Sequence, residues 1–157
     1  EQNSDSEITL FGVSMGGATV MMASGEETLP KQVVNIVEDC GYSSVWDELK
    51  YQAKAMYNLP AFPILYEVSA VSKVRAGFSY GQASCVKQLK NNTRPILFIH
   101  GSEDKFVPTS MVYKNYRATN SEKDLYIAKG AAHAKSFESD PKTYIEKISA
   151  FLQKNEK

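Results

Sequence analysis

Five residues near the amino end of the sequence, Gly12 to Gly16, place a serine between two glycines in the order Gly-Val-Ser-Met-Gly. They follow a β-prone apolar run, residues 8–11, and precede a helix-forming stretch, residues 18–24. A tight turn between a strand and a helix would hold the serine in strained backbone geometry. The pattern predicts that Ser14 presents its hydroxyl oxygen at the positive end of the helix, where an adjacent base could take its proton. The same residues could instead form a glycine-rich turn in which the serine only caps the helix.

Three more apolar runs have the length and composition of buried strands: residues 33–37, 95–99 and 124–128. Helical stretches lie between them, and the clearest helix begins at Asp140 and Pro141 and repeats apolar residues at helical spacing. Strands that alternate with helices predict an α/β fold, with a mostly parallel sheet and helices on both of its faces. We therefore expect one domain over the whole chain.

The segment of residues 43–92 departs from this alternation, because it is long, rich in aromatic residues and interrupted by prolines. We expect a helical, lid-like insertion that leaves the sheet, since long insertions at the carboxyl edge of strands often cover a site. Its apolar side chains could form a lid over an acyl group or the core of the insertion itself. They include Trp46, Tyr51, Met56, Tyr57, Phe62 and Tyr66.

A serine nucleophile needs a histidine base, and the chain has two histidines, His100 and His133. His133 lies in a loop of small residues between the last strand and the last helix. Loops at the carboxyl ends of parallel strands are where such folds place catalytic groups. His100 ends an apolar strand, where a histidine more often makes a structural hydrogen bond. We predict that His133 is the base, the alternative being an exposed loop histidine.

The base needs a carboxylate that fixes its tautomer and stabilises its charged form. Asp104 follows the strand of residues 95–99 in a segment of turn-forming residues, which could aim it inward. Asp39 follows the preceding strand in a similar way, and Glu103 would point to the other side of an extended segment. We favour Asp104, although it could also serve only to cap its turn.

Composition excludes several other functions. With 18 Lys and Arg residues against 18 Asp and Glu, the formal net charge is zero, so the chain has no basic field for nucleic acid. Cys40 and Cys85 form neither a disulfide framework nor a zinc-binding spacing, and we expect both to be small buried residues. Acyl transfer to a serine requires no metal or organic cofactor, and we expect none.

Three motifs, at residues 12–17, 99–108 and 132–134, together resemble the α/β-hydrolases of the serine esterase and serine peptidase-like group. Their order, nucleophile before acid before base, is the order of that superfamily. The resemblance implies these roles: nucleophile Ser14, acid Asp104, base His133, and one oxyanion donor at the backbone N–H of Met15. It spans nearly the whole chain.

The resemblance also implies what the chain leaves out. A complete member places several strands and an oxyanion loop before the nucleophile strand, so residues 1–157 correspond to the carboxy-terminal part of the fold, without the amino-terminal strands and that loop. Loss of one oxyanion donor typically costs about 10²–10³ in turnover, so we expect the chain alone to be weak or inactive. An unpaired first strand would favour homo-oligomers or domain swapping.

Two functions are compatible with these residues. In the first, the intact enzyme attacks an ester, or less readily an amide, and forms an acyl-serine intermediate that water resolves. Its substrate would be a small ester or acyl compound. In the second, the chain is a non-catalytic, hydrolase-like module that binds a partner or ligand and retains the same residues without an assembled site. The sequence carries no indication of cell location.

Overall fold

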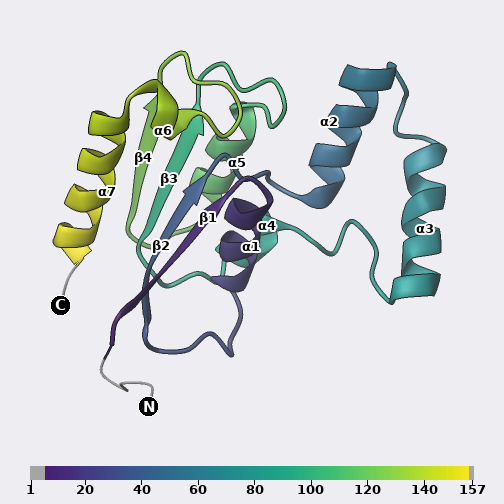
Figure 1. Ribbon diagram of the computed structural model, residues 1–157. Helices are drawn as coiled ribbons and strands as arrows, with labels where there is room; N and C mark the ends of the chain where they lie inside the picture. The colour runs from purple at the N-terminus through teal and green to yellow at the C-terminus, as the bar shows by residue number, and fades with distance from the viewer. Residues whose placement is uncertain (1–5, 156–157) are drawn as a thin grey trace.

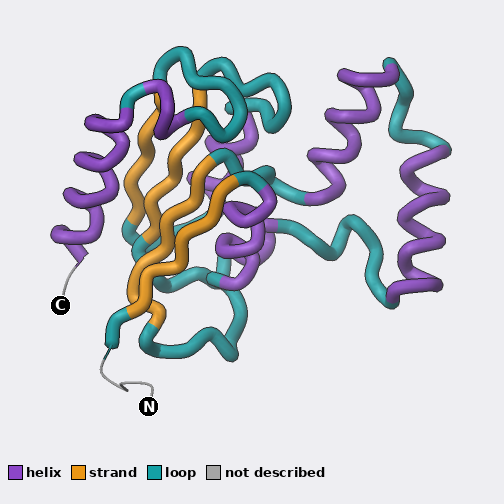
Figure 2. Tube along the Cα trace, viewed as in Figure 1, coloured by secondary structure: helices purple, strands orange, loops and turns teal. Residues whose placement is uncertain are grey.

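A parallel sheet forms the centre of the protein (Figure 1 and Figure 2). This computed structural model describes residues 6–155. Within that range the sheet has four strands, which lie side by side in chain order: β1 (Ile8–Val13), β2 (Val33–Asp39), β3 (Ile96–Gly101) and β4 (Lys123–Ala128). All three pairings between neighbouring strands are parallel, which confirms the predicted α/β fold with a parallel sheet.

Helices connect the strands and extend the chain at its end. In chain order they are α1 (Met15–Ala23), α2 (Val45–Tyr57), α3 (Ile64–Ala76), α4 (Cys85–Leu89), α5 (Ser110–Ala118), α6 (Ser136–Ser139) and α7 (Pro141–Asn155). The last of these is the helix that the sequence predicts most clearly. The Asp140 side chain accepts the backbone N–H of Thr143 at 3.0 Å and so caps its first turn.

Both faces of the sheet are covered by helices, as Figure 1 shows. Alternate residues of a strand point to opposite faces, so Ile96 and Phe98 pack with α1, α4 and α5, whereas Leu97 and Ile99 pack with α7. Burial on two faces explains why these strands are continuous apolar runs and lack an alternation of polar and apolar residues.

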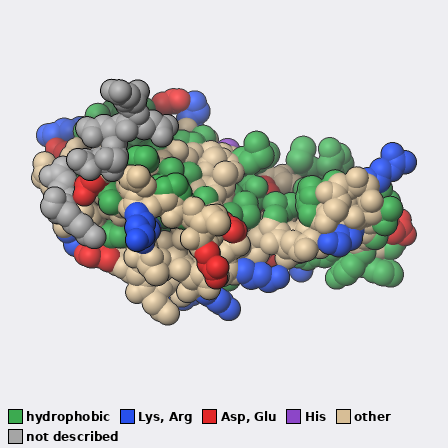
Figure 3. Space-filling model, turned by 90° about the horizontal axis from the view of Figure 1, so that it is seen from below, with side chains coloured by type: hydrophobic (Ala, Val, Ile, Leu, Met, Phe, Trp, Pro, Cys, Tyr) green, Lys and Arg blue, Asp and Glu red, His purple; other side chains and the backbone are tan. Residues whose placement is uncertain are grey.

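Helices α2 and α3 project away from the sheet (Figure 1). The rings of Trp46 and Tyr66 lie 4.8 Å apart, edge to face, and join the two helices. Met56, Tyr57 and Phe62 are exposed, and hydrophobic side chains gather on this projecting lobe in Figure 3. The aromatic residues of the insertion therefore serve partly as its own packing and partly as open apolar surface.

The projecting part is shorter than the segment of residues 43–92 that the sequence predicts. Helix α4 lies within that segment, but Cys85 and Leu89 are fully buried in the core against α1. Ser44 and Ser84 form an antiparallel bridge, and the N–H of Val45 donates to the carbonyl of Ala83 at 3.0 Å. The insertion thus leaves and rejoins the sheet layer at a single place, and its return helix belongs to the core.

The carboxyl ends of the strands lie at the same edge of the sheet, so the segments that follow them lie near one another. β1 leads directly into Ser14, β3 into a loop that carries Asp104, and β4 into a loop that carries His133. No helix among residues 6–155 combines the length and the apolar character needed to cross a membrane.

Candidate active site

Ser14 lies in a strained turn between β1 and α1. Its φ of 56° and ψ of −116° are values that residues other than glycine rarely adopt. A backbone hydrogen bond supports the turn, because the N–H of Ser14 donates to the carbonyl of Asp39 at 2.7 Å. This hydrogen bond ties the serine to the end of the neighbouring strand β2 and leaves its side chain at the sheet edge.

The two glycines of the motif have different steric roles. A Cβ atom at Gly12 would collide with the backbone carbonyl of Gly16, so only glycine fits there without a shift of the turn. A Cβ atom at Gly16 would meet no heavy atom within 4 Å. The close approach of strand and helix therefore depends on Gly12, whereas Gly16 has room for a side chain.

The structure brings Ser14, His133 and Asp104 into one hydrogen-bonded chain. The hydroxyl Oγ of Ser14 lies 2.8 Å from Nε2 of His133, and Nδ1 of His133 lies 2.7 Å from Oδ2 of Asp104. A carboxylate only accepts hydrogen bonds, so Nδ1 carries the ring proton and Nε2 is free to accept from the serine. This is the geometry that a serine, a general base and its orienting acid require.

Asp104 is buried, and both of its carboxylate oxygens accept hydrogen bonds. Its Oδ1 accepts the backbone N–H groups of Phe106 and Val107, each at 2.9 Å, within the segment of residues 102–109 that we call the Asp104 loop. Burial alone would raise the pKa of this carboxyl, but hydrogen bonds from His100, His133 and the Val107 N–H lower it below its usual value. Asp104 is therefore ionised at neutral pH, as an orienting acid must be.

The alternative candidates occupy structural positions. His100 is fully buried, with Nε2 2.9 Å from the carbonyl of Val107 and 3.4 Å from Oδ2 of Asp104, so it supports the Asp104 loop from inside. The carboxylate of Asp39 accepts the hydroxyl groups of Ser136 at 2.9 Å and Tyr144 at 3.0 Å. The Asp39 carboxylate therefore faces residues of α6 and α7. His133 bonds to Asp104 and not to Asp39.

Met15 is the first residue of α1. The first N–H groups of a helix have no partner inside the helix, and they lie at the positive end of its dipole. The backbone N–H of Met15 is thus available to a ligand beside Ser14, while the Met15 side chain is largely exposed.

The predicted burial of both cysteines is observed, and each is a free thiol. Cys40 also lies beside the site, because its sulfur and one ligand atom each from Asp104 and His133 fall within 4.8 Å of one another. Burial raises the pKa of the Cys40 thiol to about 12, so it is protonated at neutral pH and poorly suited to bind a metal. The hydrogen bonds between Ser14, His133 and Asp104 already engage the other two groups.

A second buried carboxyl, that of Glu38, lies beneath the first turn of α1. Its Oε2 accepts the N–H of Gly41 at 2.9 Å, and its Oε1 has no hydrogen-bond partner. Burial raises the pKa of Glu38 well above its usual value. A Cβ atom at Gly17 would lie 3.2 Å from Oε2, which places this carboxyl directly against the turn.

Comparison with solved structures identifies the architecture. The acylaminoacyl peptidase of Pyrococcus horikoshii superimposes with a TM-score of 0.68 at 20% identity, over 94% of this chain and 23% of that one. An esterase of Pyrococcus furiosus gives 0.65 at 19% identity, over 95% and 53% of the two chains. The chain has the α/β-hydrolase fold.

Acetyl xylan esterase 1 from Thermoanaerobacterium sp. JW/SL YS485 shares this α/β-hydrolase fold, with a TM-score of 0.66 at 18% identity over 99% of the present chain and 47% of the esterase. In sequence, the chain is 30% identical over 145 residues to the uncharacterized protein YqkD of Bacillus subtilis strain 168. That match covers 92% of this chain and 47% of YqkD, so the chain spans about half the length of this curated relative. No protein-family model matches the sequence.

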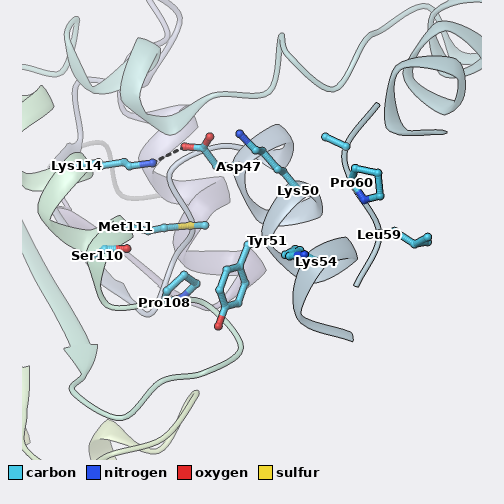
Figure 4. A pocket seen from close by; sticks show the side chains of 11 residues that line it. Asp47, Lys50, Tyr51, Lys54, Leu59, Pro60, Pro108, Ser110, Met111 and Lys114 are labelled. Carbon is cyan, nitrogen blue, oxygen red and sulfur yellow. Dashed lines mark hydrogen bonds and ion pairs between the residues drawn. The ribbon is translucent and has the colours of Figure 1, made fainter. Parts of the chain in front are cut away.

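A cavity of about 410 Å³ lies between α2 and α5 (Figure 4). Lys50, Tyr51 and Lys54 line it from the lobe, and Met111 and Lys114 line it from the sheet layer. None of the three residues in the Ser14–His133–Asp104 chain contributes to its wall. We therefore attribute this space to the junction between the lobe and the sheet layer, apart from the hydrogen-bonded Ser14, His133 and Asp104.

Proposed function

We propose that this chain carries the nucleophile, base and acid of a serine hydrolase that cleaves an ester bond, or less readily an amide. One observation carries the proposal: the unbroken contact from Ser14 Oγ through His133 to Asp104, at 2.8 Å and 2.7 Å. The solved structures of the same fold support a hydrolase, since they include esterases and a peptidase by name.

In the proposed reaction His133 Nε2 takes the proton of the Ser14 hydroxyl as Oγ attacks the carbonyl carbon of the substrate. Asp104 stabilises the imidazolium that forms. The imidazolium then gives its proton to the departing alcohol, which leaves an acyl group on Ser14. Water attacks this acyl-serine with the same histidine as base, and the acid product departs as Ser14 regains its proton.

The negative oxygen of each tetrahedral intermediate would be stabilised by the N–H of Met15. This donor lies next to the nucleophile and at the positive end of α1, where the partial charges of the first helical turn add to the hydrogen bond. A donor of this kind is typically worth about 10²–10³ in turnover.

Labelling with a fluorophosphonate probe tests the proposal directly. We expect the intact gene product to be labelled covalently at Ser14, and we expect Ser14→Ala to abolish labelling. Ser79→Ala is the matched control, because Ser79 lies in the lobe and outside the proposed site. Labelling that persists in Ser14→Ala would exclude Ser14 as the nucleophile, and a wild type that resists the probe would favour a non-catalytic binding module.

A further inference from the structure

Helix α2 is anchored on the Asp104 loop through the side chains of Tyr51 and Gln52. The amide Nε2 of Gln52 donates to the carbonyl of Phe106 at 2.7 Å, and the hydroxyl of Tyr51 donates to the carbonyl of Lys105 at 3.0 Å. Both contacts join residues 54 positions apart in the chain. The lobe therefore meets the sheet layer at the loop that carries the acid.

Glu48 fixes the orientation of Gln52. The same Nε2 of Gln52 donates to Oε1 of Glu48 at 2.8 Å, one helical turn earlier. Because both partners of this nitrogen are acceptors, only the NH₂ end of the amide can occupy that position. The amide thus cannot flip without losing two hydrogen bonds.

Glu48 is a buried carboxyl, and only one of its oxygens is hydrogen-bonded. Glu48 is 8% exposed, its Oε2 has no hydrogen-bond partner, and it forms no ion pair within the described part of the chain. Burial raises the pKa of Glu48, and the hydrogen bond from Gln52 opposes the shift. The bond from Gln52 thus holds this carboxyl in place.

Phe106 links helix α2 to Asp104 and His133. Phe106, whose carbonyl binds Gln52, donates its own N–H to Oδ1 of Asp104 at 2.9 Å. Its ring also lies against the ring of His133, with centroids 4.9 Å apart. One residue of the Asp104 loop thus contacts the lobe, the acid and the base.

We propose that Gln52 and Glu48 of α2 are positioning residues that hold Phe106, and through it the Asp104–His133 pair, in reactive geometry. On this inference, which rests on the proposed hydrolase function, the lobe contributes to the rate of the chemical step. In this role the two residues act through Phe106 and not through the substrate. Removal of either side chain should therefore lower kcat and leave KM nearly unchanged.

The test compares Gln52→Ala with Gln88→Ala in the intact gene product. Gln88 is a matched control, because its Nε2 donates to the carboxylate of Glu26 at 2.7 Å, away from the site. Misplacement of a reacting group by about 1 Å can cost about 10²-fold, so we expect Gln52→Ala to lower kcat by roughly 10- to 100-fold with KM within about twofold. Gln88→Ala should leave both constants within about twofold of wild type.

A pair of variants at Glu48 separates positioning from general destabilisation. Glu48→Gln keeps an oxygen that can accept from Gln52, so it should retain more of kcat than Glu48→Ala, with thermal unfolding measured for each. Equal kcat in Gln52→Ala and Gln88→Ala, or equal losses in the two Glu48 variants, would overturn the inference and leave the proposed function intact. A wild type that Ser14-directed probes fail to label would overturn the proposed function, and this inference with it.

Discussion

The carbonyl oxygen of Asp39 accepts the backbone N–H of Ser14 at 2.7 Å, so the strained turn of the serine rests on the end of β2. The side chain of the same aspartate faces away, toward the hydroxyl groups of Ser136 and Tyr144. Asp39 thus supports the serine through its backbone and the start of α6 and α7 through its carboxylate. Because both its carbonyl and its carboxylate make structural hydrogen bonds, Asp39 has a role that differs from that of Asp104.

This difference predicts opposite outcomes for two conservative substitutions. Asp104→Asn should lower kcat by about 10⁴-fold, because an amide cannot stabilise the protonated base or fix its tautomer. Asp39→Asn should change kcat by less than about tenfold and act mainly on stability, since it weakens buried hydrogen bonds. Steady-state kinetics and urea unfolding of both variants check this, and the reverse ranking of kcat would show that Asp39 is the acid.

The two glycines that flank Ser14 should respond differently to alanine. Gly12→Ala should destabilise the fold by about 3 kcal/mol or more, because its Cβ would collide with backbone that cannot move independently of the turn. Gly16→Ala should leave stability unchanged or raise it by up to about 1 kcal/mol, since alanine favours helix and the space is open. Denaturant unfolding compares the two, and similar losses at both positions would contradict the steric difference.

Replacement of Glu38 by glutamine should stabilise the protein at neutral pH. Burial raises the folded-state pKa of Glu38, so at any pH above the unfolded value this carboxyl lowers the stability of the folded protein, and the loss grows until the pH passes the folded pKa. As the pH falls through the folded pKa toward the unfolded value, the carboxyl takes up a proton in the folded state and the cost disappears. Glu38→Gln keeps an acceptor for the N–H of Gly41.

Urea unfolding of wild type and Glu38→Gln at about pH 7.5 and about pH 5 measures this effect. We expect the advantage of the variant to be larger at the higher pH. The matched control is Glu67→Gln, which removes an equal charge from an exposed position on α3. An advantage that is constant with pH, or equal in the control, would contradict a buried ionisable Glu38.

Strand β1 is expected to mediate self-association. Among residues 6–155 it pairs on one side only, with β2, and Phe11 and Val13 are exposed along it. An exposed apolar edge strand favours pairing with a second chain, and a lysine there opposes it. Phe11→Lys should therefore lower the fraction of dimers or larger species in sedimentation velocity runs over a range of concentrations.

The control for self-association is Val74→Lys, which places the same charge on the exposed surface of α3. It should leave the association unchanged. If Val74→Lys dissociates the assembly and Phe11→Lys does not, the apolar surface of the lobe is the interface. A wild type that remains monomeric at high concentration would show that neither surface associates.

Local signals were sufficient to predict the sheet and the candidate triad residues. The strands are continuous apolar runs because helices cover both faces, and this pattern is visible without any knowledge of contacts. In a parallel sheet the carboxyl ends of the strands share one edge, so Ser14, Asp104 and His133 could be expected to meet from their positions after strands. Their distances confirm proximity and leave the catalytic roles as predictions.

Other features depend on packing between distant segments, which no local pattern reports. Gln52 and Glu48 look like ordinary polar residues of a helix, and the contact that distinguishes Gln52 is made with a loop residue 54 positions away. Cys40 has no motif around it, yet it lies beside the site because β2 ends there. The sequence predicts that Cys85 is buried, but no local pattern shows that Cys85 and Leu89 of α4 pack against α1 instead of within the insertion.

The bridge between Ser44 and Ser84 brings the two ends of the projecting lobe together. Because these ends are already neighbours, the cost of closing a connection between them changes only slowly with the length of the chain that joins them. The intervening residues can therefore be shortened, lengthened or exchanged in evolution as a cassette, without a change in the sheet. On the proposed function, replacement of this one segment would change the surface beside the site, provided that the new segment still anchors the Asp104 loop.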